Sequence, residues 1–390
     1  MNTTQPTPIG ADTPRTLTTL QIGMGWFPEQ AGGLNRVFFN LLPALRTTGV
    51  RVRGLVAGAR GDGGDVRSFA RREDPLWRRW AGVRRAVREE MARTTFDLVA
   101  SHFALYTMPV RHMLAPLPLV VHFHGPWALE SEVEGDRFWS VWFKQWVERR
   151  VYGQAVRFIV LSEAFAGVLR ERYGVANEWI RVVPGGVDLR RFTPTISREA
   201  ARERLGWPRD RFIVLAVRRL AHRMGLEQLI DAMVRVREAH PDVLLVIAGQ
   251  GPMRTALQAR IEERGLAAHV RLVGFVADDD LPHAYRAADV SIVPTQAFEG
   301  FGLITVESLA AGTPVLVTPV GGLPEVVRDL AETLVLPGNT VADLAGGLIE
   351  VIRGTRGLPE PAMCRAYAEA RFDWAVVARQ TRSVYEEVVA

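Results

Sequence analysis

Short apolar runs alternate along this chain with longer segments in which apolar residues recur every three or four positions. The run at 17–25 is followed by a glycine-containing loop and then by a periodic segment of six residues: Leu34, Val37, Phe38, Leu41, Leu42 and Leu45. Continuous runs of this length predict strands buried on both faces, and the i, i+3, i+4 spacing predicts amphipathic helices. Their alternation is typical of βαβ units and parallel sheets.

The pattern occurs as two successive series. The first predicts strands at 17–25, 50–58, 96–102, 118–124, 157–163 and 180–186. The second predicts strands at 211–217, 243–249, 269–275, 289–294, 313–319 and 333–337. Between them lies 188–210, a charged, proline-containing segment that is the best candidate for a linker. We therefore expect two Rossmann-like domains that face each other, with the ligand site in the cleft at the carboxyl ends of their strands.

The expected boundaries follow from these series. Residues 1–16 are polar and proline-containing, which predicts a flexible tail and not a signal peptide. The N-terminal domain is expected at 17–190 and the C-terminal domain at 191–372, with a helix at about 373–390 packing back on the first domain. No stretch of about 18 uninterrupted apolar residues is present, so we expect no membrane span.

Composition adds little to this picture. The chain has 390 residues and a formal net charge of +5, and Lys144 is its only lysine among 48 basic residues. Arginine therefore accounts for the high pI, and because no nucleic-acid-binding module is present we expect no nucleic-acid partner. Cys364 is the only cysteine, so no disulfide can form within the chain, which fits a reducing cytosol.

The most specific chemical signal is the segment EGFGLITVESLAAGTPV, which begins at Glu299. Glu299 should lie in the loop after a strand, and Glu307 about a turn and a half into the following helix. Unpaired N–H groups at the start of that helix favour phosphate and sugar oxygens, and carboxylates accept hydrogen bonds from paired sugar hydroxyls.

This segment resembles the donor-binding core of the family 4 retaining glycosyltransferases, whose Glu-x7-Glu motif has the same glycine and proline setting. The resemblance extends over nearly the whole chain from about residue 20 and implies the GT-B fold. It further implies that Glu307 holds the ribose hydroxyls, that Glu299 contacts the donor sugar, and that the backbone of Phe301, Gly302 and Leu303 meets sugar hydroxyls and phosphate.

Other segments follow the same family pattern. Gly32 and Gly33 match the glycine loop over the donor phosphate, and His124, in VVHFHGPW, would face the reacting sugar. Val276 would offer backbone hydrogen bonds to the nucleobase, where Asp278 could accept from guanine but reads more simply as a surface residue. The resemblance assigns catalysis to His124, Glu299 and Arg219.

The segment VRRLAHRMG matches the family's G-R-L-x-x-x-K-G stretch, and Arg219 aligns with the arginine that clamps the donor diphosphate. The family's lysine falls at Met224, which is the main departure. Arg223, one residue earlier, either supplies the missing charge or is a solvated residue at the start of a helix.

We therefore expect a retaining hexosyltransferase that uses a UDP- or GDP-sugar without a metal or other cofactor. His122 and His124 alone are too few ligands for a metal site. Two alternatives remain open: another GT-B enzyme, such as a sugar-nucleotide epimerase, or a non-catalytic nucleotide-sugar-binding protein. A phosphorylase is disfavoured because Lys144, the only lysine, lies in the N-terminal half.

Two basic amphipathic segments in the N-terminal half bear on the acceptor, which we expect to be a sugar or a lipid-linked precursor of a polysaccharide. One, 72–93, has an apolar stripe of Leu76, Trp80, Val83 and Val87; the other has a stripe of Trp139, Trp142, Phe143, Trp146 and Val147. Such helices either pack against the core or lie on an anionic membrane. The expected location is the cytoplasm, with peripheral contact at the cytoplasmic face of the inner membrane as an addition.

Overall fold

The computed structural model describes residues 16–390 except 28, 31, 59–63 and 194. The predicted tail, 1–16, lies outside the described residues apart from its last residue. Within the described part, no helix is both long and apolar enough to cross a bilayer.

Seven parallel strands form the N-terminal sheet, in the order β3-β2-β1-β4-β5-β6-β7. The strands are β1 Leu17–Gly25, β2 Val50–Ala57, β3 Val66–Ala70, β4 Leu98–Ser101, β5 Leu119–Phe123, β6 Arg157–Val160 and β7 Ile180–Val182. The helices of this half are α1 Gly33–Thr47, α2 Leu76–Arg93, α3 Ala104–Thr107, α4 Trp127–Val133, α5 Phe138–Tyr152 and α6 Glu163–Tyr173. Strand β3 is absent from the sequence prediction, because it is an edge strand that pairs only with β2 and buries only Val66 and Phe69.

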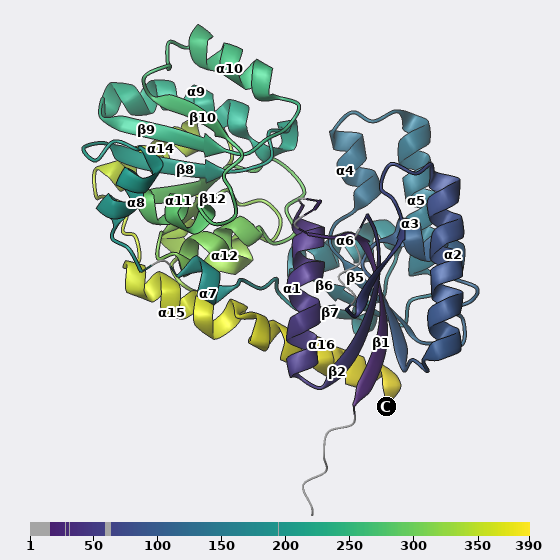
Figure 1. Cartoon of the computed structure of the whole chain (residues 1–390). Helices are drawn as coiled ribbons and strands as arrows, with labels where there is room; N and C mark the ends of the chain where they lie inside the picture. The colour runs from purple at the N-terminus through teal and green to yellow at the C-terminus, as the bar shows by residue number, and fades with distance from the viewer. Residues whose placement is uncertain (1–15, 28, 31, 59–63, 194) are drawn as a thin grey trace, which may run out of the picture.

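Five parallel strands form the C-terminal sheet, in the order β10-β9-β8-β11-β12. The strands are β8 Phe212–Val217, β9 Val243–Ala248, β10 Val270–Gly274, β11 Val290–Val293 and β12 Val315–Val317. The helices of this half are α9 Leu226–Ala239, α10 Arg254–Glu263, α11 Leu281–Ala287, α12 Leu303–Ala310, α13 Leu323–Val327, α14 Val341–Ile352 and α15 Pro361–Phe372. The two parallel α/β domains lie side by side (Figure 1), which confirms the predicted fold class.

Two predicted elements differ in detail. The segment 188–210, the candidate linker, contains helices α7 Leu189–Phe192 and α8 Arg198–Leu205, and α8 packs against α11 of the C-terminal domain. The run at 333–337 is not a strand. Its backbone closes a 3-10 turn at Glu332–Leu334, and only Val335 pairs with β12, at Val317.

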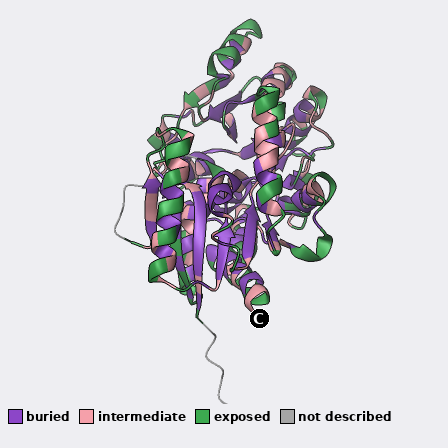
Figure 2. Cartoon of the chain, turned by 90° about the vertical axis from the view of Figure 1, so that its right-hand side faces the viewer, coloured by how far each residue is buried: buried purple, intermediate pink, exposed green. Residues whose placement is uncertain are grey.

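The chain passes between the domains twice, and the two passages lie together. Val187 N donates to Phe372 O at 2.7 Å. Beyond this point α16, Trp374–Val389, returns to the first domain and packs against α1. In Figure 1 the yellow helices α15 and α16 run beneath both domains. Figure 2 shows buried strands inside and helices with exposed outer faces, the pattern expected where helices cover both faces of a parallel sheet.

Candidate active site

A cavity of about 530 Å³ lies between the two domains. Its wall includes residues at or just beyond the carboxyl ends of β1, β4 and β5 on one side and β8 and β11 on the other, which is where the sequence predicted a ligand site. Nine predicted site residues line it: Gly32, Gly33, His124, Arg219, Arg223, Glu299, Phe301, Gly302 and Leu303. Val276 and Glu307 do not line it.

The loop that carries Glu299 is fixed by unusual backbone geometry. Phe298, just before it, has a φ of 49°, a conformation that residues other than glycine rarely adopt. Gly321 lies so close that a Cβ there would be 2.0 Å from Glu299 O, so no larger residue fits. Gly302, with a φ of 77°, then starts α12 without a side-chain cap. The N–H groups of the first helical turn are therefore free of a capping side chain and can meet a ligand.

Glu307, the fifth residue of α12, is buried, and both of its carboxylate oxygens have polar partners. Tyr285 Oη donates to Oε2 at 3.0 Å, and Arg36 Nη1 lies 3.3 Å from Oε1. Arg36 belongs to α1 of the other domain and also pairs with Asp278 at 3.0 Å, so Asp278 is not a simple surface residue. Burial raises the pKa of Glu307, and the charge of Arg36 opposes that rise. A ribose bound here would compete with Arg36.

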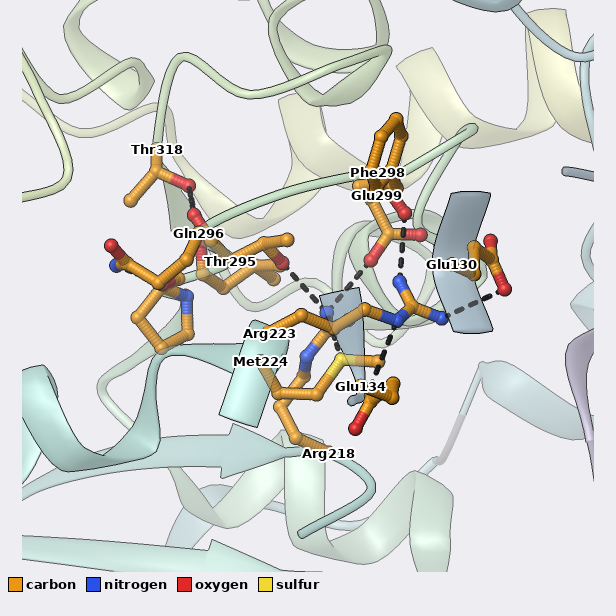
Figure 3. Close-up of polar contacts among 12 residues, drawn as sticks. Glu130, Glu134, Arg218, Arg223, Met224, Thr295, Gln296, Phe298, Glu299 and Thr318 are labelled. Atoms are coloured by element: carbon orange, nitrogen blue, oxygen red, sulfur yellow. Dashed lines mark hydrogen bonds and ion pairs between the residues drawn. The ribbon is translucent and has the colours of Figure 1, made fainter. Parts of the chain in front are cut away.

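The two predicted phosphate-binding arginines point toward α4 of the N-terminal domain (Figure 3 for Arg223). Arg219 is exposed and pairs with Glu134 at 3.2 Å. Arg223 pairs with Glu130 and Glu134, each at 3.3 Å. Its Nη1 also donates to Phe298 O at 2.7 Å and so holds the strained residue before Glu299. The alternative of a solvated Arg223 is wrong, because only 12% of its side chain is exposed.

Arg218, which the sequence reasoning passed over, is the arginine in direct contact with Glu299. Its Nη2 lies 2.7 Å from Glu299 Oε2 and also donates to Thr295 Oγ1 at 2.6 Å (Figure 3). The side chain is 6% exposed and lines the cavity. The available signal was the Arg-Arg pair itself, since a second arginine stands where the family pattern has glycine.

Three histidines meet on the opposite wall, where the sequence reasoning counted two. His102 Nε2 lies 2.9 Å from Gln21 Oε1, an acceptor, so that nitrogen carries the proton. His102 Nδ1 then accepts from His124 Nε2 at 3.1 Å, which leaves His124 Nδ1 as an acceptor with no hydrogen-bond partner in the described part of the chain. Burial lowers the pKa of His124 to about 4, so its ring is neutral.

The same cluster reopens the question of a metal, because His102, His122 and His124 place ring nitrogens within 4.8 Å of one another. The three rings are stacked, with interplanar angles of 18° to 21°, so their lone pairs lie in nearly parallel planes, which disfavours convergence on one metal ion. His122 Nε2 is hydrogen-bonded to Tyr385 Oη of α16 at 2.7 Å. The geometry fits a hydrogen-bonded network better than a tetrahedral site.

Glu148 is a further cavity residue that the sequence did not predict. It lies on α5, lines the cavity and is buried. Tyr173 Oη donates to it at 2.8 Å, and Ala128 N, at the start of α4, lies 3.4 Å away. Burial raises its pKa to about 7. No pattern in the sequence marks this glutamate, because its neighbours come from three separate segments.

The two predicted amphipathic segments are helices α2 and α5, and they differ in how many of their apolar residues face the core. On α2, Val83 and Val87 are buried and Leu76 and Trp80 pack against the core, so this stripe faces inward. On α5, Val147 is buried, and Phe143 and Trp146 pack beside it. Three aromatic side chains remain outside: Phe138, Trp139 and Trp142, which are 71%, 76% and 54% exposed. We call these three the α5 aromatic patch.

Comparison with known proteins decides the family. Residues 31–191 match the family model described as Glycosyltransferase Family 4, and residues 197–371 match the one described as Glycosyl transferases group 1. A 2-deoxystreptamine glucosyltransferase of Streptomyces kanamyceticus is 30% identical over 292 residues, which cover 71% of this chain and 72% of that protein. This chain belongs to the family 4 glycosyltransferases.

Three further comparisons define the extent of the similarity to other glycosyltransferases. A D-inositol 3-phosphate glycosyltransferase of Streptomyces bingchenggensis is 33% identical over 251 residues, but the match spans 62% of this chain and only 55% of that protein. Sucrose-phosphate synthase from Thermosynechococcus elongatus superposes with a TM-score of 0.78 at 24% identity, over 95% of this chain and 98% of that one. Anabaena HepE in complex with UDP and glucose gives 0.76 at 22% identity, over 95% and 100%. The last two comparisons establish the GT-B fold.

Proposed function

We propose that this protein transfers a hexose-type sugar from a UDP- or GDP-sugar to an acceptor hydroxyl, with retention of configuration and without a metal or other cofactor. The observation that carries the proposal is convergence on one cavity. Glu299, the uncapped start of α12 and the Gly32-Gly33 loop all face it, beside a group of arginines. The family membership and the HepE complex with UDP and glucose support the same donor class.

In the proposed reaction, the bond between the sugar's anomeric carbon and the diphosphate oxygen breaks. The negative charge on the leaving diphosphate is stabilised by the arginines and by the N–H groups at the start of α12. The acceptor oxygen forms the new bond on the same face, and its proton goes to a phosphate oxygen. Neutral His124 would hydrogen-bond to the sugar through Nδ1, and Glu299 would hold sugar hydroxyls.

Glu307 and Val276 would bind the nucleoside, beside the phosphates. Binding of the ribose to Glu307 requires that Arg36 move away from Glu307 Oε1 or that Arg36 and Glu307 both contact the ribose. A sugar-nucleotide epimerase or a binding protein without turnover would use the same donor contacts. Identifying the bound nucleotide sugar therefore does not distinguish these functions, whereas identifying the reaction product does.

A screen of nucleotide sugars tests the proposal. Thermal shift identifies the donor, and proton NMR of the released or transferred sugar reports the configuration at the anomeric carbon. We expect one UDP- or GDP-hexose to stabilise the protein and to give an α product from an α donor. An inverted product would refute retention, and a converted sugar still attached to nucleotide would favour the epimerase.

For the acceptor, we propose a membrane-associated or lipid-linked molecule, met by a protein of the cytoplasm that binds the inner membrane peripherally. The α5 aromatic patch lies in the acceptor half, and tryptophans favour the headgroup level of a bilayer. In flotation with anionic vesicles at low salt, we expect the Trp139→Ala/Trp142→Ala variant to lose binding and Trp179→Ala to keep it. Efficient transfer to a soluble acceptor by protein that never floats would refute the membrane account.

A further inference from the structure

We propose that Arg218 and Met224 form a matched pair, in which the Arg218 guanidinium supplies the donor-site cation that the family pattern places on a lysine at 224. The inference rests on the proposed function. Two departures from the pattern G-R-L-x-x-x-K-G are involved, since Arg218 stands at its glycine and Met224 at its lysine. The structure connects these two departures.

The ends of the Arg218 and Met224 side chains are in contact. Arg218 directly follows β8, and Met224 lies in the 3-10 turn His222–Met224. Arg218 Nη2 is 2.7 Å from Met224 Sδ (Figure 3). Both residues line the cavity. A guanidinium from position 218 thus occupies the place that a side chain at 224 reaches.

Arg218 is equipped to hold an anion. Its Nη2 is committed to Glu299 and Thr295, whereas its Nε is buried and has no hydrogen-bond partner among the described residues. An unsatisfied N–H on a buried cation favours a ligand oxygen, and the planar fork of a guanidinium suits phosphate. Arg219 and Arg223, by contrast, direct their charge toward Glu130 of α4 and Glu134, the residue that follows this helix.

The pairing also explains why position 224 is uncharged. A lysine there would bring an ammonium group against the Arg218 guanidinium in a buried place, and like charges at that distance repel strongly. The thioether of methionine carries no charge and is flexible enough to fill the space beside the arginine. This position beside Glu299 therefore accommodates one cation, supplied either from 218 or from 224.

A double-mutant cycle tests this directly. Binding of UDP and of GDP is measured by calorimetry for the wild type, Arg218→Gly, Met224→Lys and the double variant, with Arg209→Gly as the matched control on an exposed arginine. We expect each single variant to lose tenfold or more in affinity, the double variant to return to within about threefold of the wild type, and the control to be unchanged. Thermal melts of the same four proteins should show that Met224→Lys destabilises the wild type and not the Arg218→Gly background.

The pairing would be overturned if the affinity losses of the two single variants multiplied in the double variant. It would also be overturned if Arg218→Gly kept the wild-type affinity. If the glycine variant does not fold, Arg218→Met keeps the side-chain length and takes its place in the cycle. A wild-type protein that binds neither nucleotide would refute the proposed function, and the ligand role of Arg218 with it. The melts would still report the repulsion between 218 and 224.

Discussion

On the C-terminal wall of the cavity, Glu299 lies against Arg218, and in the proposed nucleoside site beside it Glu307 lies against Arg36 of α1. The N-terminal wall holds Glu130, which pairs with Arg223, together with neutral imidazoles and Glu148. Glu148 is a buried carboxyl that forms no ion pair with any described residue. Its partners are the hydroxyls of Tyr173 and Tyr152 and a backbone N–H. The paired charges suit a charged ligand such as a diphosphate, whereas the part of the N-terminal wall around the histidines suits a sugar or another hydroxyl-bearing molecule.

The largest effect that we expect on the N-terminal wall concerns Glu148. Its folded pKa of about 7 lies above the ordinary 4.5, so the native state binds more protons than the unfolded state between these values. Stability is therefore lost as the pH rises through this window, by about 3 kcal/mol at most. Glu148→Gln should not show this loss.

Melts of the wild type and Glu148→Gln from about pH 5 to about pH 8 measure the difference. The buried histidines, whose lowered pKa values cost stability at acid pH, are common to both proteins and cancel. Glu171→Gln, on an exposed residue of α6, serves as the control and should follow the wild type. Parallel curves for the wild type and Glu148→Gln would contradict the raised pKa.

A smaller effect is expected where the two walls meet. Glu134 pairs with both Arg219 and Arg223, so Glu134→Gln should free part of their charge for the donor. Partly exposed ion pairs are worth about 0.2–1 kcal/mol, so the nucleotide affinity should rise by up to roughly fivefold. The matched control is Glu132→Gln, an exposed residue on the same helix. A weaker affinity in Glu134→Gln would mean that α4 supports the donor site instead of competing with the donor.

No effect at all is expected from metal removal. If the three histidines form a hydrogen-bonded network, dialysis against EDTA should leave turnover unchanged. Loss of turnover that Mg²⁺ or Mn²⁺ restores would contradict the metal-free mechanism, and restoration by Zn²⁺ would point to the histidine cluster as the site.

The two walls also differ in how far they could be predicted. The Glu-x7-Glu motif is contiguous, so Glu299, Gly302 and Leu303, which line the cavity, could be predicted as site residues from one segment. Alternation of apolar runs was enough for the parallel α/β fold. The histidine network joins Gln21, His102, His124 and, through His122, Tyr385, which come from four distant parts of the chain. Contacts of this kind depend on strand order and on the return of α16, neither of which leaves a local pattern.

A similar limit applies to the arginines. Motif alignment favoured Arg219 over Arg218, but the side chain after a strand end points to one face or the other according to the local backbone, which the pattern does not specify. Arg36 could not be anticipated either, because its partners Glu307 and Asp278 are 271 and 242 residues away in sequence. Long-range ion pairs across a domain interface become visible only in three dimensions.

The donor site itself is tested most directly by calorimetric titration of UDP and GDP into the wild type and Glu307→Ala. Loss of a charged acceptor for two ribose hydroxyls should cost about 1.5–3 kcal/mol, which is roughly tenfold or more in affinity. Glu332→Ala, on an exposed glutamate of the same domain, is the control and should bind like the wild type. We predict nucleotide binding by the wild type that is weakened only in Glu307→Ala; equal affinity in all three proteins would contradict the donor site described here.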